Sequence, residues 1–216
     1  MQKHKNIFFY CGLLMLFSEV WKQWCLTYIL NNGHYNWWYF PFQLCSIPMY
    51  ICLILPWIRS PQIYDAFLTF LMDFGMLGGI FAFCDTSGMY YHYPPLTIHS
   101  FAWHVLLIIL GLYAGFTISK SISIQNYLKS AGIYLICCVI ATIWNLLFHP
   151  YGNINMFYIS PYYVMAQKVF CKLALILGNN AGIAIYIAST LFGAWIFHCI
   201  WMFLKRGLKI SVNSLF

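Results

Sequence analysis

The feature that most constrains this chain is a series of apolar runs long enough to cross a lipid bilayer. A transmembrane helix needs about 20 predominantly apolar residues. Six such runs lie at about residues 7–30, 39–58, 62–84, 97–118, 130–148 and 181–204. The sequence therefore predicts an all-α, polytopic bundle of six transmembrane spans, in a single domain over residues 1–216.

Composition excludes a soluble globular domain. Hydrophobic residues make up 62% of the chain and charged residues 7%, whereas soluble domains are about 25% charged. A net charge of +7 is also found in nucleic-acid-binding proteins, but here the basic residues stand singly between apolar runs, as topology signals do. We therefore expect no nucleic-acid partner. The nine cysteines show no CxxC spacing, and most are expected to pack as small apolar residues.

Charge also predicts the topology. With a cytoplasmic N-terminus and six spans, eight basic residues fall on the cytoplasmic side and the three outer loops carry no Lys or Arg. A seventh crossing by the apolar segment 161–177, which contains Lys168 and Lys172, would place the basic C-terminal residues outside, against the positive-inside rule. We expect this segment to be a re-entrant or interfacial helix on the outer side, with both termini cytoplasmic. Short loops are typical of a protein of the bacterial plasma membrane. The eight basic residues expected on the cytoplasmic side are Lys3, Lys5, Arg59, Lys120, Lys129, Lys205, Arg206 and Lys209.

Cys45 and His104 are the most informative polar residues inside the predicted spans. In the six-span topology each lies six or seven residues from the outer end of its helix, which is a depth of roughly 10 Å. A thiol beside an imidazole is the minimal pair of nucleophile and base. The alternative for each residue is structural: the cysteine packs as a small side chain and the histidine hydrogen-bonds a neighbouring helix.

Sequence around Cys45 favours an activated thiol. Pro41 is a preferred first-turn residue, which predicts a helix that begins there with Cys45 one turn in. A helix N-terminus stabilises a thiolate, and Pro48 frees the backbone carbonyl of Leu44. Two amides are expected to assist: Gln43 as a donor to an oxyanion, and Asn145 as a residue that orients His104 or stabilises the oxyanion.

Three charged residues, Glu19, Lys22 and Asp73, lie nearer the middle of the membrane. Glu19 and Lys22 are three residues apart, which predicts an ion pair within the first helix. Together with Asp73 they could instead form a proton or cation relay. A small proton- or ion-coupled transporter is therefore the alternative function.

A metal-binding protein is the weakest alternative. Its ligands would come from Cys45, His99, His104 and His149, but none of these residues shows the tight spacing of known metal sites. We expect no metal and no organic cofactor. The small-xxx-small pairs Gly75–Gly79 and Gly111–Gly115 are expected to serve close helix packing.

Residues around Cys45 carry a family resemblance. The segment Phe40-Pro41-Phe42-Gln43-Leu44-Cys45 resembles the Leu-Pro-Leu-His-Leu-Cys motif of the YwaF-type bacterial membrane proteins, which are related to the eukaryotic acyltransferases called transmembrane protein 164. Three further features fit the same pattern and extend it over roughly residues 15–165. They are Glu19, the His104 helix that runs into Gly111-Leu112-Tyr113, and Asn153-Ile154-Asn155-Met156-Phe157 followed by Pro161.

The resemblance implies a six-helix fold similar to that of the threonine–histidine transmembrane lipid hydrolases, with cysteine in place of threonine. It implies transfer or hydrolysis of a phospholipid acyl chain through an acyl-cysteine, with a phospholipid and a lysophospholipid as membrane partners. Cys45 would be the nucleophile and His104 the base. Asn153 and Asn155 would line the substrate site, and Ser100 is expected to line it too because it lies one turn before His104 and shares its helix face. Gln43 departs from the family histidine, Phe42 replaces a leucine, and the Asn-Tyr-Met-Phe element is matched only loosely.

Overall fold

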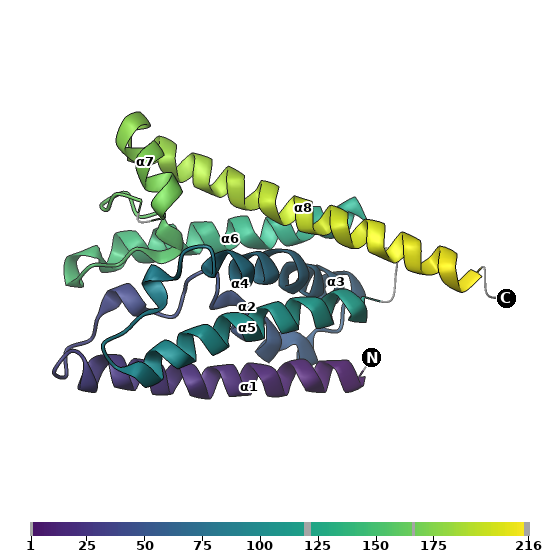
Figure 1. The fold of residues 1–216 in the computed structure, drawn as a ribbon, viewed down its shortest axis with the longest axis horizontal. Helices are drawn as coiled ribbons and strands as arrows, with labels where there is room; N and C mark the ends of the chain where they lie inside the picture. Colours follow the sequence, from purple (N-terminus) through teal and green to yellow (C-terminus); the bar gives the residue numbers. More distant parts are fainter. Residues whose placement is uncertain (1, 119–121, 166, 214–216) are drawn as a thin grey trace.

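The protein is a bundle of helices. The computed structural model describes residues 2–118, 122–165 and 167–213, and these residues form helices and connecting segments without a strand. The longest helices run roughly along the long axis of the molecule (Figure 1). They are α1 (Gln2–Trp24), α5 (Pro94–Thr117), α6 (Ile124–Phe148) and α8 (Asn179–Asn213). The predicted all-α fold is confirmed.

A composite helix occupies the middle of the bundle. It consists of α3 (Pro61–Phe70), a π-helical turn η4 (Leu71–Gly75) and α4 (Met76–Ala82), which follow one another without a break. Its residues are the most buried of the long apolar helices, because α5, α6 and α8 all pack against it.

Shorter elements complete the chain. α2 (Ile47–Ile54) continues into the 3-10 turn η3 (Leu55–Trp57), and α7 (Lys168–Leu177) precedes α8. The remaining helical turns lie in connecting segments or extend a helix end. They are η1 (Cys25–Ile29), η2 (Trp37–Tyr39), η5 (Thr86–Met89), η6 (His149–Tyr151) and η7 (Met156–Tyr158).

Four helices of the described residues are long and apolar enough to cross a membrane: 61–82, 94–117, 124–151 and 179–207. α1 has 23 residues, but its four charged side chains make it less apolar than those four. The second predicted span contains only the short apolar helix 47–57. α7 has ten residues, about half the length that a crossing needs. The structure thus supports a transmembrane helical bundle, and the six-span count stays a prediction.

The start of the second apolar segment differs from our expectation. The helix does not begin at Pro41 but at Ile47, so Cys45 lies in a turn just before α2 and not one turn inside it. Pro48 lies in the first turn of the observed helix, a place that suits a proline because it has no N–H to donate, and Pro41 offers the same local preference without starting a helix. The residues before Pro48 form turns instead, with Ser46 N–H donating to the Gln43 carbonyl at 2.8 Å.

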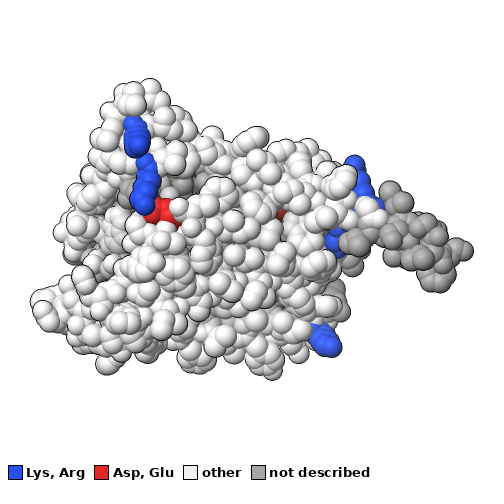
Figure 2. Space-filling model, viewed as in Figure 1, with Lys and Arg blue, Asp and Glu red and all other residues white. Residues whose placement is uncertain are grey.

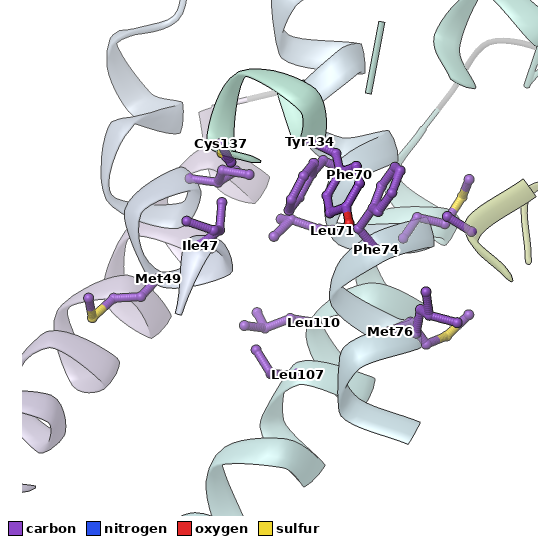
Figure 3. Packing of buried hydrophobic residues seen from close by; sticks show 14 of the residues in the cluster. Ile47, Met49, Phe70, Leu71, Phe74, Met76, Leu107, Leu110, Tyr134 and Cys137 are labelled. Carbon is purple, nitrogen blue, oxygen red and sulfur yellow. The ribbon is translucent and has the colours of Figure 1, made fainter. Parts of the chain in front are cut away.

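Aromatic stacking and small residues hold the centre of the bundle together. Figure 3 shows the rings of Phe70, Phe74 and Tyr134 in one stack, with centroids 5.1 and 4.9 Å apart. α5 packs closely on α4, since a Cβ added at Gly79 would lie 3.0 Å from the His104 carbonyl oxygen, and one at Gly111 would lie 2.9 Å from the Leu71 carbonyl oxygen. The predicted packing role is confirmed for these two glycines.

Basic charge is confined to the ends of the bundle on the face that Figure 2 shows. Basic side chains gather at the two ends of the long axis, and the surface between them is almost free of charge. The N-terminal end of α1 and the C-terminal end of α8 lie at the same end of the bundle (Figure 1). Lys120 and the side chain of Lys209 lie outside the described residues.

Candidate functional site

A cavity of about 570 Å³ opens between the helices, at the end of the bundle that carries α7. Its wall draws on α1, α4, α5, α7 and α8, together with the irregular segment before α2. Aromatic and small apolar side chains dominate this wall. The polar and charged side chains that interrupt them include Lys22, Gln43, Cys45, Ser46, Asp85, Ser100, His99, His104, Ser189 and Thr190.

Cys45 and His104 both line this cavity. The two residues that the sequence pairs thus share one cavity wall, although they come from different segments. A hydrogen bond from the residue before His104 joins α5 to the Cys45 backbone: Trp103 Nε1–H donates to the carbonyl oxygen of Cys45 at 3.0 Å. Gly79 lets α4 approach the His104 carbonyl closely, which fixes α5 on the other side.

The imidazole of His104 has a defined tautomer. Its Nδ1 lies 2.7 Å from the carbonyl oxygen of Ser100, one turn earlier on α5. A carbonyl only accepts, so Nδ1 carries the proton and donates it. Nε2 is then the basic nitrogen, which is the arrangement that a general base requires.

Gln43 joins the segment before α2 to the distant segment around Asn155 through two hydrogen bonds. Its Nε2–H donates to the Asn155 carbonyl at 2.9 Å, and its Oε1 accepts from Phe157 N–H at 2.7 Å. The clamped backbone is unusual, because Phe157 and Tyr158 have φ values of 57° and 58°, in a region that non-glycine residues rarely adopt. Such strain persists only where surrounding contacts impose it. The result is that Tyr158 lines the cavity.

Asn145 clamps the same segment from α6. Its Oδ1 accepts from Met156 N–H at 2.6 Å, and its Nδ2–H donates to the Met156 carbonyl at 3.1 Å. Asn145 is fully buried and lies outside the cavity wall. Its contacts with the protein are therefore those of a positioning residue.

Two further predicted lining residues also lie outside the wall. Asn155 is fully buried, and its Oδ1 accepts from Ser160 N–H at 2.9 Å. Asn153 accepts a hydrogen bond of 3.0 Å from the Tyr163 hydroxyl. The segment that contains them reaches the cavity through Tyr158, whereas Ser100 lines it directly.

Lys22 brings a positive charge to the cavity wall. Its Nζ lies 2.8 Å from Glu19 Oε2, with 17% of the lysine side chain and 4% of the glutamate side chain exposed. Gln23 supports the carboxylate through a 2.7 Å hydrogen bond to Oε1. The ion pair predicted within the first helix is thus present in the structure.

Asp73 belongs to a different cluster. Its Oδ2 lies 2.8 Å from His198 Nδ1, and both side chains are fully buried. His198 Nε2–H donates to the Ser123 carbonyl at 3.0 Å, so one proton is shared between Nδ1 and Oδ2. The contacts of Asp73 thus run to α8, while those of Glu19 and Lys22 stay on α1 and the wall of the cavity. The three charged residues do not form one chain of hydrogen bonds in this structure.

The metal alternative gains no geometric support. Within the ranges that the structure describes, no group of three or more His, Cys, Asp and Glu side chains has an arrangement that could hold an ion. His149 lies outside the cavity wall and stacks on Tyr162 with ring centroids 3.7 Å apart. Of the four predicted metal ligands, Cys45, His99 and His104 line the cavity, and His149 does not.

A surface ion pair joins a loop to the start of α7 at the same end of the molecule. Lys168 Nζ lies 2.7 Å from Asp85 Oδ1, and Figure 2 shows blue beside red at the end that carries α7. The hydrogen bonds from Lys168 and Ser87 lower the pKa of the Asp85 carboxyl to about 2. This pair links the segment before α5 to the first residue of α7.

Three residues with clear structural roles were missed by the sequence analysis. His198 is an ionisable residue in an apolar helix, which is by itself a signal. Gln23 stands one turn after Glu19, and that spacing predicts the hydrogen bond. No sequence feature predicts the role of Tyr158, since its place in the cavity depends on backbone that folds back after α6.

Comparison with known proteins identifies the family. No curated protein and no solved structure matches the chain. The model of the TMEM164 family matches residues 2–202, which is nearly the whole chain, and the matched region includes every residue of the cavity wall. The chain belongs to the TMEM164 family of membrane proteins.

Proposed function

We propose that the protein is a membrane-embedded lipid acyltransferase or acyl hydrolase that works through an acyl-cysteine on Cys45. The observation that carries the proposal is the shared cavity: Cys45 and His104 line one space of about 570 Å³, and His104 presents Nε2 as its basic nitrogen. Membership of the TMEM164 family and an apolar cavity wall support a lipid substrate.

The reaction begins with proton transfer. A thiol that is enclosed in an apolar cavity keeps its proton until a base removes it, so His104 Nε2 takes the proton as Cys45 Sγ attacks the ester carbonyl of a phospholipid. The C–O bond to the glycerol then breaks. The departing lysophospholipid oxygen receives the proton from His104, and the acyl chain remains on Cys45 as a thioester.

The second half reverses these steps with a new acceptor. The hydroxyl of a lysophospholipid, or water, gives its proton to His104 and attacks the thioester carbonyl. The S–C bond breaks, and the proton returns to Cys45 Sγ. A lysophospholipid acceptor gives acyl transfer and water gives hydrolysis, and no cofactor takes part in either route.

Oxyanion donors are available next to Cys45. At the start of α2, Pro48 has no N–H and Met49 N–H donates to the Ser46 carbonyl, so Ile47 N–H is the backbone candidate, and Gln43 Nε2 has a second N–H beside the one that it donates to Asn155. These groups would bind the oxygen that becomes negative in the tetrahedral intermediate. Asn145 would contribute indirectly, because it holds the segment that Gln43 also binds.

A six-span topology suits this mechanism. α1 and the second apolar segment would cross together with the four long apolar helices, which would put both termini in the cytoplasm and α7 on the outer face. The cavity would then open toward the outer leaflet, where the ester groups of phospholipids lie just above the hydrocarbon core. Short loops fit a bacterial plasma membrane.

Lipid-acyl turnover by purified protein tests the proposal. Cys45→Ala and His104→Ala should each lower the rate at least about a hundredfold, because each removes a group that acts in the chemical step. Cys11→Ala and His92→Ala are matched controls outside the cavity wall and should leave the rate unchanged. Full turnover in either of the first two variants would refute the proposal.

A further inference from the structure

Lys22 has hydrogen-bonding capacity that the protein does not use. An ammonium group has three N–H donors, and its contact among the described residues is the 2.8 Å approach to Glu19 Oε2. Most of the side chain is removed from solvent, and the group lies on the wall of the cavity. An unfilled cationic donor in such a place favours binding of an anion.

His99 adds unused capacity next to Lys22. Its ring lies between those of Trp21 and Trp103, at 5.6 Å from each. Both ring nitrogens are buried without a hydrogen-bond partner, although the residue lines the cavity. Lys22 and His99 line the same cavity, and Trp21, the residue before Lys22 on α1, contacts the His99 ring.

The site for the anion is close to the site of the chemistry. Lys22, His99, Cys45 and His104 all line the same cavity, so the ammonium group faces the space that the Cys45–His104 pair also faces. In a phospholipid the phosphate is joined to the same glycerol unit as the ester carbonyls. A lipid whose ester meets Cys45 therefore has its phosphate only a few bonds away.

We propose that Lys22 forms a subsite for the phosphate of a membrane lipid, beside the Cys45–His104 pair. The inference rests on the proposed function only in taking the cavity as a lipid site, and it adds which lipids bind there. Phosphate-bearing lipids are selected over neutral glycerolipids with the same acyl chains. Glu19 holds Lys22 in place when the cavity is empty and competes with the phosphate for it.

Lipid binding without turnover tests this subsite. In a Cys45→Ala background, native mass spectrometry of the purified protein compares a phosphatidic acid with a diacylglycerol of identical acyl chains. The phosphatidic acid should bind about 10 to 100 times more tightly, as a charge-assisted hydrogen bond permits. Adding Lys22→Met should reduce this preference to less than about threefold, with diacylglycerol binding unchanged.

Two further variants separate binding from a structural role. Glu19→Gln breaks the same ion pair but keeps the ammonium group, so it should retain or increase the preference for phosphatidic acid. Lys172→Met removes a lysine of α7 that lies outside the cavity wall and should leave the preference unchanged. Equal loss in Glu19→Gln and Lys22→Met, or an undiminished preference in Lys22→Met, would overturn the subsite.

The source of the phosphate is tested in the same assay. Inorganic phosphate at the concentration of the lipid should not displace phosphatidic acid, because it lacks acyl chains to fill the apolar wall. Displacement would assign the site to free phosphate and overturn the lipid assignment. The assay needs no acyl-cysteine, so a failure of the subsite and a failure of the catalytic pair give different results.

Discussion

Two groups of ionisable residues lie within this apolar bundle, and they differ in how completely the protein surrounds them. Asp73 and His198 are fully buried and joined at 2.8 Å, and the second imidazole nitrogen bonds the Ser123 carbonyl. Cys45, His104 and Lys22 instead line a cavity. There the basic nitrogen of His104 and two of the lysine donors remain available for a ligand.

This difference separates polar residues that hold helices together from polar residues that can react. A polar group in a membrane bundle is costly unless it has partners. The Asp73–His198 pair joins α8 to the central helix through Asp73 Oδ2 and encloses Oδ1 without a hydrogen-bond partner and away from the cavity, which predicts an effect on stability. The cavity residues leave capacity unused, which predicts an effect on binding and turnover.

The largest expected effect on stability is at the fully buried pair of Asp73 and His198. Asp73→Ala leaves His198 buried without its charged partner, and such a loss lowers the free energy of unfolding by about 3 kcal/mol. Thermal unfolding in detergent micelles measures it. The folded fraction should still form the acyl-enzyme on Cys45, because the pair lies outside the cavity wall.

A double variant sharpens this test. Asp73→Leu combined with His198→Phe removes both polar groups, and it should recover most of the stability lost in either single variant, since replacing a buried pair by apolar side chains is often neutral. Single variants that lose turnover while unfolding like the wild type would contradict the division between the two groups.

An intermediate effect is expected at Gln43, which lines the cavity and also holds a distant backbone segment through hydrogen bonds. Gln43→Leu breaks the hydrogen bonds to Asn155 and Phe157 and should lower the free energy of unfolding by about 2 kcal/mol. Tyr158 then loses its fixed position in the cavity, and acyl turnover should fall by about tenfold.

Gln43→Glu is the companion variant: it keeps the acceptor for Phe157 N–H, but its ionised carboxylate loses the donor to the Asn155 carbonyl and adds a charge. Its free energy of unfolding relative to Gln43→Leu should rise as the pH is lowered, because the protonated carboxyl again donates and accepts. An unchanged difference between the two variants at every pH would show that the hydrogen bonds of Gln43 are irrelevant.

The smallest effect concerns the surface pair of Asp85 and Lys168. The pKa of Asp85 is lowered to about 2, so its contribution to stability is present at neutral pH and disappears as the pH falls toward 2. Asp85→Asn should lower the thermal midpoint by about 2 °C or less at pH 7. The difference from the wild type should vanish near pH 2, and a difference that grows on acidification would contradict this pair.

Sequence alone could predict the features that depend on composition and on nearby residues. Apolar runs predicted the helical membrane bundle, and a spacing of three predicted the Glu19–Lys22 pair. Depth within the predicted spans placed Cys45 and His104 in one layer, and the structure brings both to one cavity.

Features that depend on long-range packing could not be predicted. The helix start at Ile47 was missed because Pro41 and Pro48 both satisfy the same local preference, and tertiary contacts decide between them. The His198 partner of Asp73 is 125 residues away. Gln43 looked like a free donor, but the backbone that it binds is 112 to 114 residues further along the chain.

The most direct test of the central claim is the reactivity of the cysteines. A thiol-reactive, lipid-like probe is added to the detergent-purified protein, and its adducts are mapped over the nine cysteines by mass spectrometry. Cys45 should label far faster than the exposed Cys84, and His104→Ala should abolish that advantage. Labelling that follows exposure, with Cys84 ahead of Cys45 and no effect of His104→Ala, would contradict an activated cysteine in this cavity.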